Sequence, residues 1–143
     1  VDCLTANSIS TFGGNPVSTA GATAALDYVL DHDLQQNARL QGDRLYAGLR
    51  DVQGKYDVVG DVRGKGLMIG VELVEPGGNR PSPHAAAAVL ERTKAAGLLV
   101  GKGGLYGNVI RLAPPMTLTD DETAEGLQIL TETIAATHEE LTR

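Results

Sequence analysis

The spacing of apolar residues changes near the middle of the chain, from that of a helix to that of a strand. Leu45, Leu49 and Val52 follow helical spacing. After Gly66 the apolar residues alternate with others instead, and one face of the predicted strand carries Leu67, Ile69, Val71 and Leu73. A strand face that is apolar throughout has to be covered, so this pattern predicts helices packed on a sheet.

The helical part contains the start signals of two helices. Asn15–Pro16 suits an N-cap followed by the first helical position, which predicts a helix to about His32. Asp33 is predicted as a second N-cap, with Gln36 completing a capping box. A single straight helix through both would be about 54 Å long, whereas a compact chain of this size is about 37 Å across. We therefore expect either a break near Asp31–Asp33 or a helix that projects from the compact part of the chain.

The rest of the chain predicts short strands between helices. The expected elements are strands near 58–62 and 67–74, a helix from Ser82–Pro83 to Ala96, strands at about 98–100 and 109–112, and a C-terminal helix that starts with the capping box of Thr119 and Glu122. Strands and helices do not alternate one for one, which argues against a doubly wound sheet. The predicted fold class is α+β: a small, mostly antiparallel sheet with helices on one face.

Charge and composition narrow the range of partners. The 143 residues carry a net charge of -6 with scattered bases, which argues against a nucleic-acid or membrane partner and leaves small molecules or proteins. Cys3 is the single cysteine, so we expect no intrachain disulfide and a reducing, cytoplasmic location without a signal peptide. The chain begins at Val1 and its first methionine is Met68, so we expect a processed chain or a piece of a longer reading frame.

Several familiar motifs are incomplete. The Gly64–Gly70 segment differs from a dinucleotide fingerprint because its third glycine is one position late and a strand follows it. Lys102 is followed by Gly103, whereas a phosphate-binding loop would have Ser or Thr there. The three histidines have no metal-ligand spacing, and no Gly-x-Ser-x-Gly elbow occurs. We therefore expect no metal site, and a nucleotide-binding domain is disfavoured.

Two features remain as candidate binding residues. Arg111 lies inside the apolar segment Val109–Ala113, where a desolvated guanidinium needs an anion, either structural or a substrate carboxylate. Ser10 and Thr11 precede Gly13–Gly14 and offer hydroxyls that either bind a phosphate or satisfy a local turn.

Three further segments stand out in the sequence, namely Ser10–Pro16 (STFGGNP), Gly60–Glu72 (GDVRGKGLMIGVE) and Val109–Pro115 (VIRLAPP). In order and spacing they together resemble the C-terminal part of class III pyridoxal-phosphate aminotransferases. Within that family the resemblance is closest to the alanine-glyoxylate type 2 and 4-aminobutyrate branch. It implies three parts: 1–16, a loop segment from the end of the large domain; 17–54, connecting helices; and 55–143, the α+β small domain of fold type I aminotransferases.

The resemblance also implies roles for the candidate residues. Thr11, with Ser10 beside it, would bind the phosphate of pyridoxal 5'-phosphate in the neighbouring subunit of a homodimer. Arg111 would hold the carboxylate of the amino acid and 2-oxo acid substrates. The family's Schiff-base lysine lies upstream of the matched region, so this chain would contain no catalytic residue.

The predicted function is therefore that of a C-terminal portion of an aminotransferase, inactive on its own. Lys55, Lys65, Lys94 and Lys102 lie in or near turns or on a helix face, where an amine stays solvated and protonated, so none is expected to replace the missing lysine. The alternative is a stand-alone, non-catalytic binding or assembly module.

Overall fold

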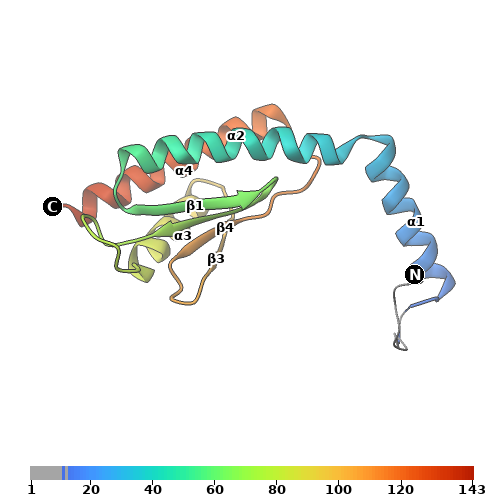
Figure 1. Cartoon of the computed structure of the whole chain (residues 1–143), viewed down its shortest axis with the longest axis horizontal. Helices are drawn as coiled ribbons and strands as arrows, with labels where there is room; N and C mark the ends of the chain where they lie inside the picture. The colour runs from blue at the N-terminus through green and yellow to red at the C-terminus, as the bar shows by residue number, and fades with distance from the viewer. Residues whose placement is uncertain (1–10, 12) are drawn as a thin grey trace. The chain divides into compact units, whose positions relative to one another are not determined.

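The computed structural model describes residues 11 and 13–143 (Figure 1). Cys3 and Ser10 lie outside the described residues. The helices and strands are α1 (Pro16–Asp31), α2 (Leu34–Lys55), β1 (Val59–Lys65), β2 (Met68–Leu73), α3 (Pro83–Ala95), β3 (Gly101–Gly103), β4 (Val109–Leu112) and α4 (Asp120–Leu141). By their contacts they form two units, Val1–Leu34 and Gln35–Arg143.

The first unit contains α1, whose start agrees with the sequence. Asn15 Oδ1 accepts hydrogen bonds from the backbone N–H groups of Val17 (2.9 Å) and Ser18 (3.3 Å), which confirms the predicted N-cap. None of the 16 residues of α1 is buried. Within its own unit, this helix is therefore held by local hydrogen bonds rather than by a core.

The break between α1 and α2 lies at the predicted place, but the backbone conformation of Asp33 differs from the prediction. Asp33 has a φ of 49°, in the left-handed region, whereas an N-cap residue has extended backbone. The Gln36 side chain accepts a hydrogen bond from Arg39 Nε at 3.1 Å instead of closing a capping box. The predicted cap at Asp33 is therefore wrong. Asp33 forms the turn itself, since aspartate tolerates this conformation better than most residues.

The second unit is a four-stranded antiparallel sheet with helices packed against one face. The strand order is β1-β2-β4-β3, and all three pairings are antiparallel. The inner sheet face and three helices share one apolar core, with Val62, Ile69, Val71, Leu73, Ile110 and Leu112 from the sheet, Leu45, Leu49 and Val52 from α2, Ala85, Ala86 and Val89 from α3, and Leu130 and Ile134 from α4. The α+β prediction is confirmed, including the buried face that the alternation in β2 indicates.

Helices α2 and α4 lie side by side and run in the same direction over the sheet (Figure 1). Near their starts, the buried Gln41 side chain donates to Asp120 Oδ1 at 2.6 Å and accepts from Thr123 Oγ1 at 2.9 Å. Just beyond the end of α2, Asp57 Oδ1 lies 3.1 Å from His138 Nδ1 near the end of α4. Hydrogen bonds of Gln41 therefore link the starts of the two helices, and the approach of Asp57 to His138 shows that their ends also lie close together.

Strand β3 lies three residues later than the sequence indicates. It spans Gly101–Gly103, whereas the prediction placed a strand at about 98–100 and an irregular segment after it. Gly104 and Gly107, with φ of 85° and 65°, close the turn to β4. In such a hairpin the residues next to the turn must pair, so Gly101 is placed opposite Arg111. Turn geometry here outweighs the low strand propensity of glycine.

Candidate functional site

Arg111 projects from the outer face of the sheet, opposite to the helices. Its neighbours in the strand, Ile110 and Leu112, are buried on the inner face, whereas Arg111 is exposed. Side chains alternate between the faces of a strand, so the pattern in β4 follows from the sequence. The guanidinium is thus presented to solvent at the middle of the sheet.

Arg111 is exposed, contrary to the expectation from its apolar neighbours in the sequence. We expected a desolvated guanidinium that needs an anion to offset the cost of burial, but Arg111 is exposed and carries no such cost. Nor does any residue of the described part of the chain form an ion pair or a hydrogen bond with its side chain. Arg111 is therefore available to an external carboxylate without first breaking an internal pair.

Glycines flank Arg111 on both neighbouring strands. Gly70 of β2 and Gly101 of β3 are its register partners. A Cβ atom on Gly101 would lie 3.6 Å from Arg111 Nε, so the arginine side chain extends over this glycine. Neither partner has a side chain of its own, but a Cβ atom on Gly70 would lie 3.3 Å from Cγ1 of Val109, so the space on that side is bounded by the valine. Sequence reasoning missed this pair, since the glycines become neighbours of Arg111 only through strand pairing.

An ionic cluster lies next to Arg111 on the same face and was also missed. Arg63 of β1 donates from Nη1 to Asp61 Oδ2 at 2.9 Å and to Glu72 Oε2 at 2.6 Å. These hydrogen bonds, that of Asp61 first, raise the pKa of Arg63 above its ordinary value. The alternation of β1 and β2 is the sequence signal that places all three side chains on one face.

Thr11, the other predicted binding residue that the structure describes, is exposed just before α1. No hydrogen bond joins its hydroxyl to another described residue. The nearby helix N-terminus is already occupied, because Asn15 accepts from the first free amides, those of Val17 and Ser18. The Thr11 hydroxyl is therefore exposed without a partner among the described residues, whereas those two amides are already hydrogen-bonded. Thr11 and Arg111 belong to different units, and each is described within its own unit.

All four lysines are exposed, namely Lys55, Lys65, Lys94 and Lys102. An amine that acts as a nucleophile near neutral pH needs burial or a neighbouring cation to lower its pKa. Exposed lysines lack that burial.

The described residues also show no metal site. No group of three or more potential ligands occurs among their histidine, cysteine, aspartate and glutamate residues. Nor is any helix in the described part long and apolar enough to cross a membrane.

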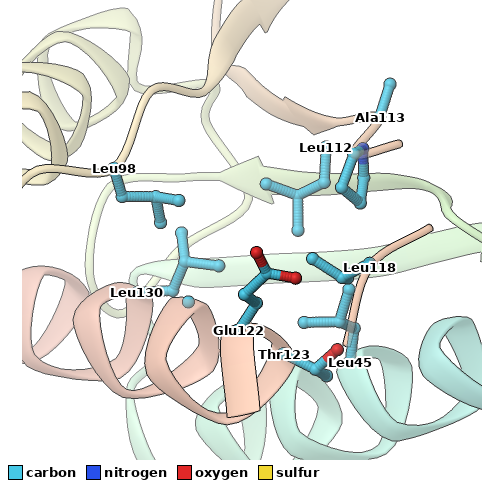
Figure 2. Close-up of a pocket in the computed structure, with 10 residues that line it drawn as sticks. Leu45, Leu98, Leu112, Ala113, Leu118, Glu122, Thr123 and Leu130 are labelled. Atoms are coloured by element: carbon cyan, nitrogen blue, oxygen red, sulfur yellow. The ribbon is translucent and has the colours of Figure 1, made fainter. Parts of the chain in front are cut away.

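An apolar cavity of about 80 Å³ lies on the inner side of the sheet, away from Arg111 (Figure 2). Leucines of α2, α4, β4 and the adjoining loops surround it, with the Glu122 carboxylate pointing between them (Figure 2). That carboxylate accepts from the backbone N–H of Thr119 at 2.9 Å and from its hydroxyl at 2.8 Å, so it completes the capping box at the start of α4. The cavity is too small for a substrate of several heavy atoms together with a cofactor, and it does not contact the candidate arginine.

Comparison with known proteins identifies similar sequences over nearly the whole chain. A family model described as Aminotransferase class-III matches residues 3–134. The 4-aminobutyrate aminotransferase of Mycobacterium leprae is 45% identical over 124 residues, which cover 84% of this chain and 27% of that protein. The mitochondrial alanine–glyoxylate aminotransferase 2 homolog 2 of Arabidopsis thaliana is 41% identical over 114 residues, or 79% of this chain and 24% of that protein.

Two further similarities cover more of the chain. The alanine/serine racemase of Pyrococcus horikoshii is 36% identical over 137 residues, which are 96% of this chain and 29% of that protein. The structure of the ornithine aminotransferase from Toxoplasma gondii, described as having partial occupancy of PLP at its active site, matches with a TM-score of 0.82 and 28% identity, covering 98% of this chain and 32% of that one. The chain thus spans only 24% to 29% of the length of these curated relatives.

Proposed function

The chain belongs to the class III aminotransferase family, and we propose that the complete protein transfers an amino group between an amino acid or amine and a 2-oxo acid, with pyridoxal 5'-phosphate as cofactor. The observation that carries the proposal is Arg111, an exposed guanidinium that has no partner among the described residues and lies between two glycines of the neighbouring strands. A planar guanidinium binds a carboxylate through two parallel hydrogen bonds, which fixes the orientation of the substrate as well as its position.

In this proposal Arg111 binds and orients the substrate carboxylate, so that the reacting carbon is presented in one geometry. The Thr11 hydroxyl donates to the cofactor phosphate. The cofactor, when bound, supplies an electron sink for the bonding electrons of the substrate carbon. The exposure of the four lysines supports a reactive amine from outside these 143 residues.

We further propose that the complete protein is a homodimer in which Thr11 serves the site of the partner subunit. Helix α1, which follows Thr11, contains no buried residue, and this supports the proposal, because an uncovered helix leaves its surface available to another body.

The test compares two substitutions in the complete protein. Arg111→Lys keeps the charge but loses the two-pronged geometry, so we expect the KM for carboxylate substrates to rise about tenfold while the Kd of the cofactor stays nearly unchanged. Thr11→Ala should weaken cofactor binding and leave the carboxylate preference intact. Arg50→Lys on the exposed side of α2 and Thr23→Ala in α1 are the matched controls. Equal loss of cofactor and substrate binding in Arg111→Lys would contradict the assigned roles.

The racemase similarity favours a second candidate function, inversion of a small amino acid. The same arginine would hold the carboxylate, but no 2-oxo acid would be needed. Incubation of the complete protein with one enantiomer of alanine, with and without an added 2-oxo acid, separates the two activities. A D/L mixture formed without the oxo acid supports racemisation, and oxo-acid-dependent formation of a new amino acid supports transamination.

A further inference from the structure

The outer face of the sheet carries two adjacent cross-strand rows of side chains. One row runs Arg63, Gly70, Arg111, and the next runs Asp61, Glu72, Val109. Glu72 is therefore the diagonal neighbour of Arg111 across the β2–β4 pair. Diagonal neighbours in antiparallel strands are about 7–8 Å apart at their Cα atoms, within reach of long side chains. Glu72 is the acidic residue best placed in this register to pair with Arg111.

Glu72 is nevertheless engaged elsewhere. Its Oε2 accepts from Arg63 Nη1 at 2.6 Å, on the side of the row away from Arg111. Its Oε1 lies 3.4 Å from Asn108 Nδ2, and Asn108 is buried and fixed by a 2.9 Å hydrogen bond to the Leu73 carbonyl. Both carboxylate oxygens of Glu72 thus have partners other than Arg111.

The charges of the two rows balance only while Arg63 is present. The two rows carry two cations, Arg63 and Arg111, and two anions, Asp61 and Glu72, and both anions form ion pairs with Arg63. Without Arg63, two carboxylates would share one guanidinium. Glu72 would be free to turn to Arg111, and the remaining negative charge would repel an anionic substrate.

We propose that Arg63 is a positioning residue that keeps Glu72 away from Arg111, so that Arg111 remains available for the substrate carboxylate. This inference rests on the proposed role of Arg111. Arg63 itself does not touch the substrate. It acts by holding an internal carboxylate that would otherwise compete for the same guanidinium, and it thereby determines how well the site selects carboxylate-bearing substrates.

The experiment uses the complete, cofactor-loaded protein with two substrates, an amino acid and a primary amine that lacks a carboxylate. Arg63→Gln should raise the KM for the amino acid about two- to fivefold, the range that one exposed ion pair supports, with kcat little changed. The KM for the amine should not move. Arg63→Lys, which keeps the charge, should resemble the unsubstituted protein.

The decisive variant is Arg63→Gln combined with Glu72→Gln, because it removes the competing carboxylate. It should restore the amino-acid KM to within about twofold of the unsubstituted value. If the double variant is not restored, or if Arg63→Gln changes both substrates equally, the role of Arg63 is overturned while that of Arg111 stands. If Arg111→Lys causes no carboxylate-selective loss, the proposed function itself fails, and the two failures are thereby distinguished.

Discussion

Gly101 of β3 lies directly opposite Arg111 of β4, and its missing side chain leaves the space over which the arginine extends. A Cβ atom at this glycine would be 3.4 Å from the Arg111 carbonyl oxygen and 3.6 Å from its Nε. Those distances are ordinary contacts, so alanine would fit, but the two γ-methyl groups of valine would enter the space of the guanidinium.

Gly101→Val is therefore expected to displace the Arg111 side chain and to raise the KM for carboxylate substrates of the complete protein about tenfold, the value of one charge-assisted hydrogen bond. Gly103→Val is the matched control, because Gly103 lies on the same face of the same strand and a Cβ there would meet nothing within 4 Å. Steady-state kinetics of both variants measures the two KM values. Equal effects of the two substitutions would show that β3 as a whole, rather than the contact with Arg111, is responsible.

Gly42 of α2 lies against the β1–β2 turn so closely that it has no room for a side chain. An added Cβ would be 2.3 Å from the carbonyl carbon of Gly66, a backbone atom that cannot rotate away. Although alanine favours helices over glycine by about 1 kcal/mol, Gly42→Ala should lower the free energy of unfolding by about 1–3 kcal/mol through overpacking.

Gly54→Ala, in the same helix with nothing within 4 Å of the new Cβ, should raise stability by up to about 1 kcal/mol. Urea unfolding of both variants measures the contrast. A stabilising effect at Gly42 would contradict the close approach of α2 to the turn.

Gln41 is a buried amide that links α2 to α4, with 2% of its surface exposed. It donates to Asp120 and accepts from Thr123, whereas both side-chain hydrogen bonds of Gln53, to the Gly60 carbonyl and from Arg50, are exposed. Gln41→Leu should cost about 1–3 kcal/mol of unfolding free energy, because polar partners lose their hydrogen bonds. Gln53→Leu should change stability by less than about 0.5 kcal/mol. Comparable losses in thermal unfolding would show that the buried network adds nothing.

Glu122 makes the stability of the start of α4 depend on pH. Hydrogen bonds from the Thr119 backbone and then from its hydroxyl lower the pKa of the Glu122 carboxyl below its ordinary value of 4.5. Because the pKa is lower in the folded state, the contribution of Glu122 to stability is complete above the ordinary value and is lost as the pH falls through the folded-state pKa.

Between about pH 6 and about pH 3, Glu122→Gln should therefore lose less unfolding free energy than the unsubstituted chain does. Urea midpoints of both proteins at each pH measure the difference. Glu125→Gln, which removes an exposed carboxyl from the same helix, is the matched control. Identical pH profiles for Glu122→Gln and the unsubstituted chain would contradict the capping role.

Much of the fold follows from local sequence signals. The caps at Asn15, Ser82 and Thr119 form as predicted, because each acts over the next two or three residues. The alternation in β2 likewise determines which face is buried. Asp33 and β3 differ from the prediction because a turn decides the local structure at each place. At Asp33 a turn replaces the predicted cap, and at β3 the hairpin turn places the strand on glycines of low strand propensity.

Part of the candidate site also follows from the sequence, and part follows only from the tertiary structure. The sequence by itself determined that Arg111 is in a strand between two inward-facing residues and that Thr11 precedes a helix. Only the tertiary structure decided what surrounds Arg111: the glycines on both sides, and Glu72 bound to Arg63 on the adjacent row. The physical reason is the distance along the chain over which each interaction acts. Backbone propensity and capping act within about four residues along the chain, whereas the partners of a side chain on a sheet are set by strand register, which depends on the packing of the whole unit.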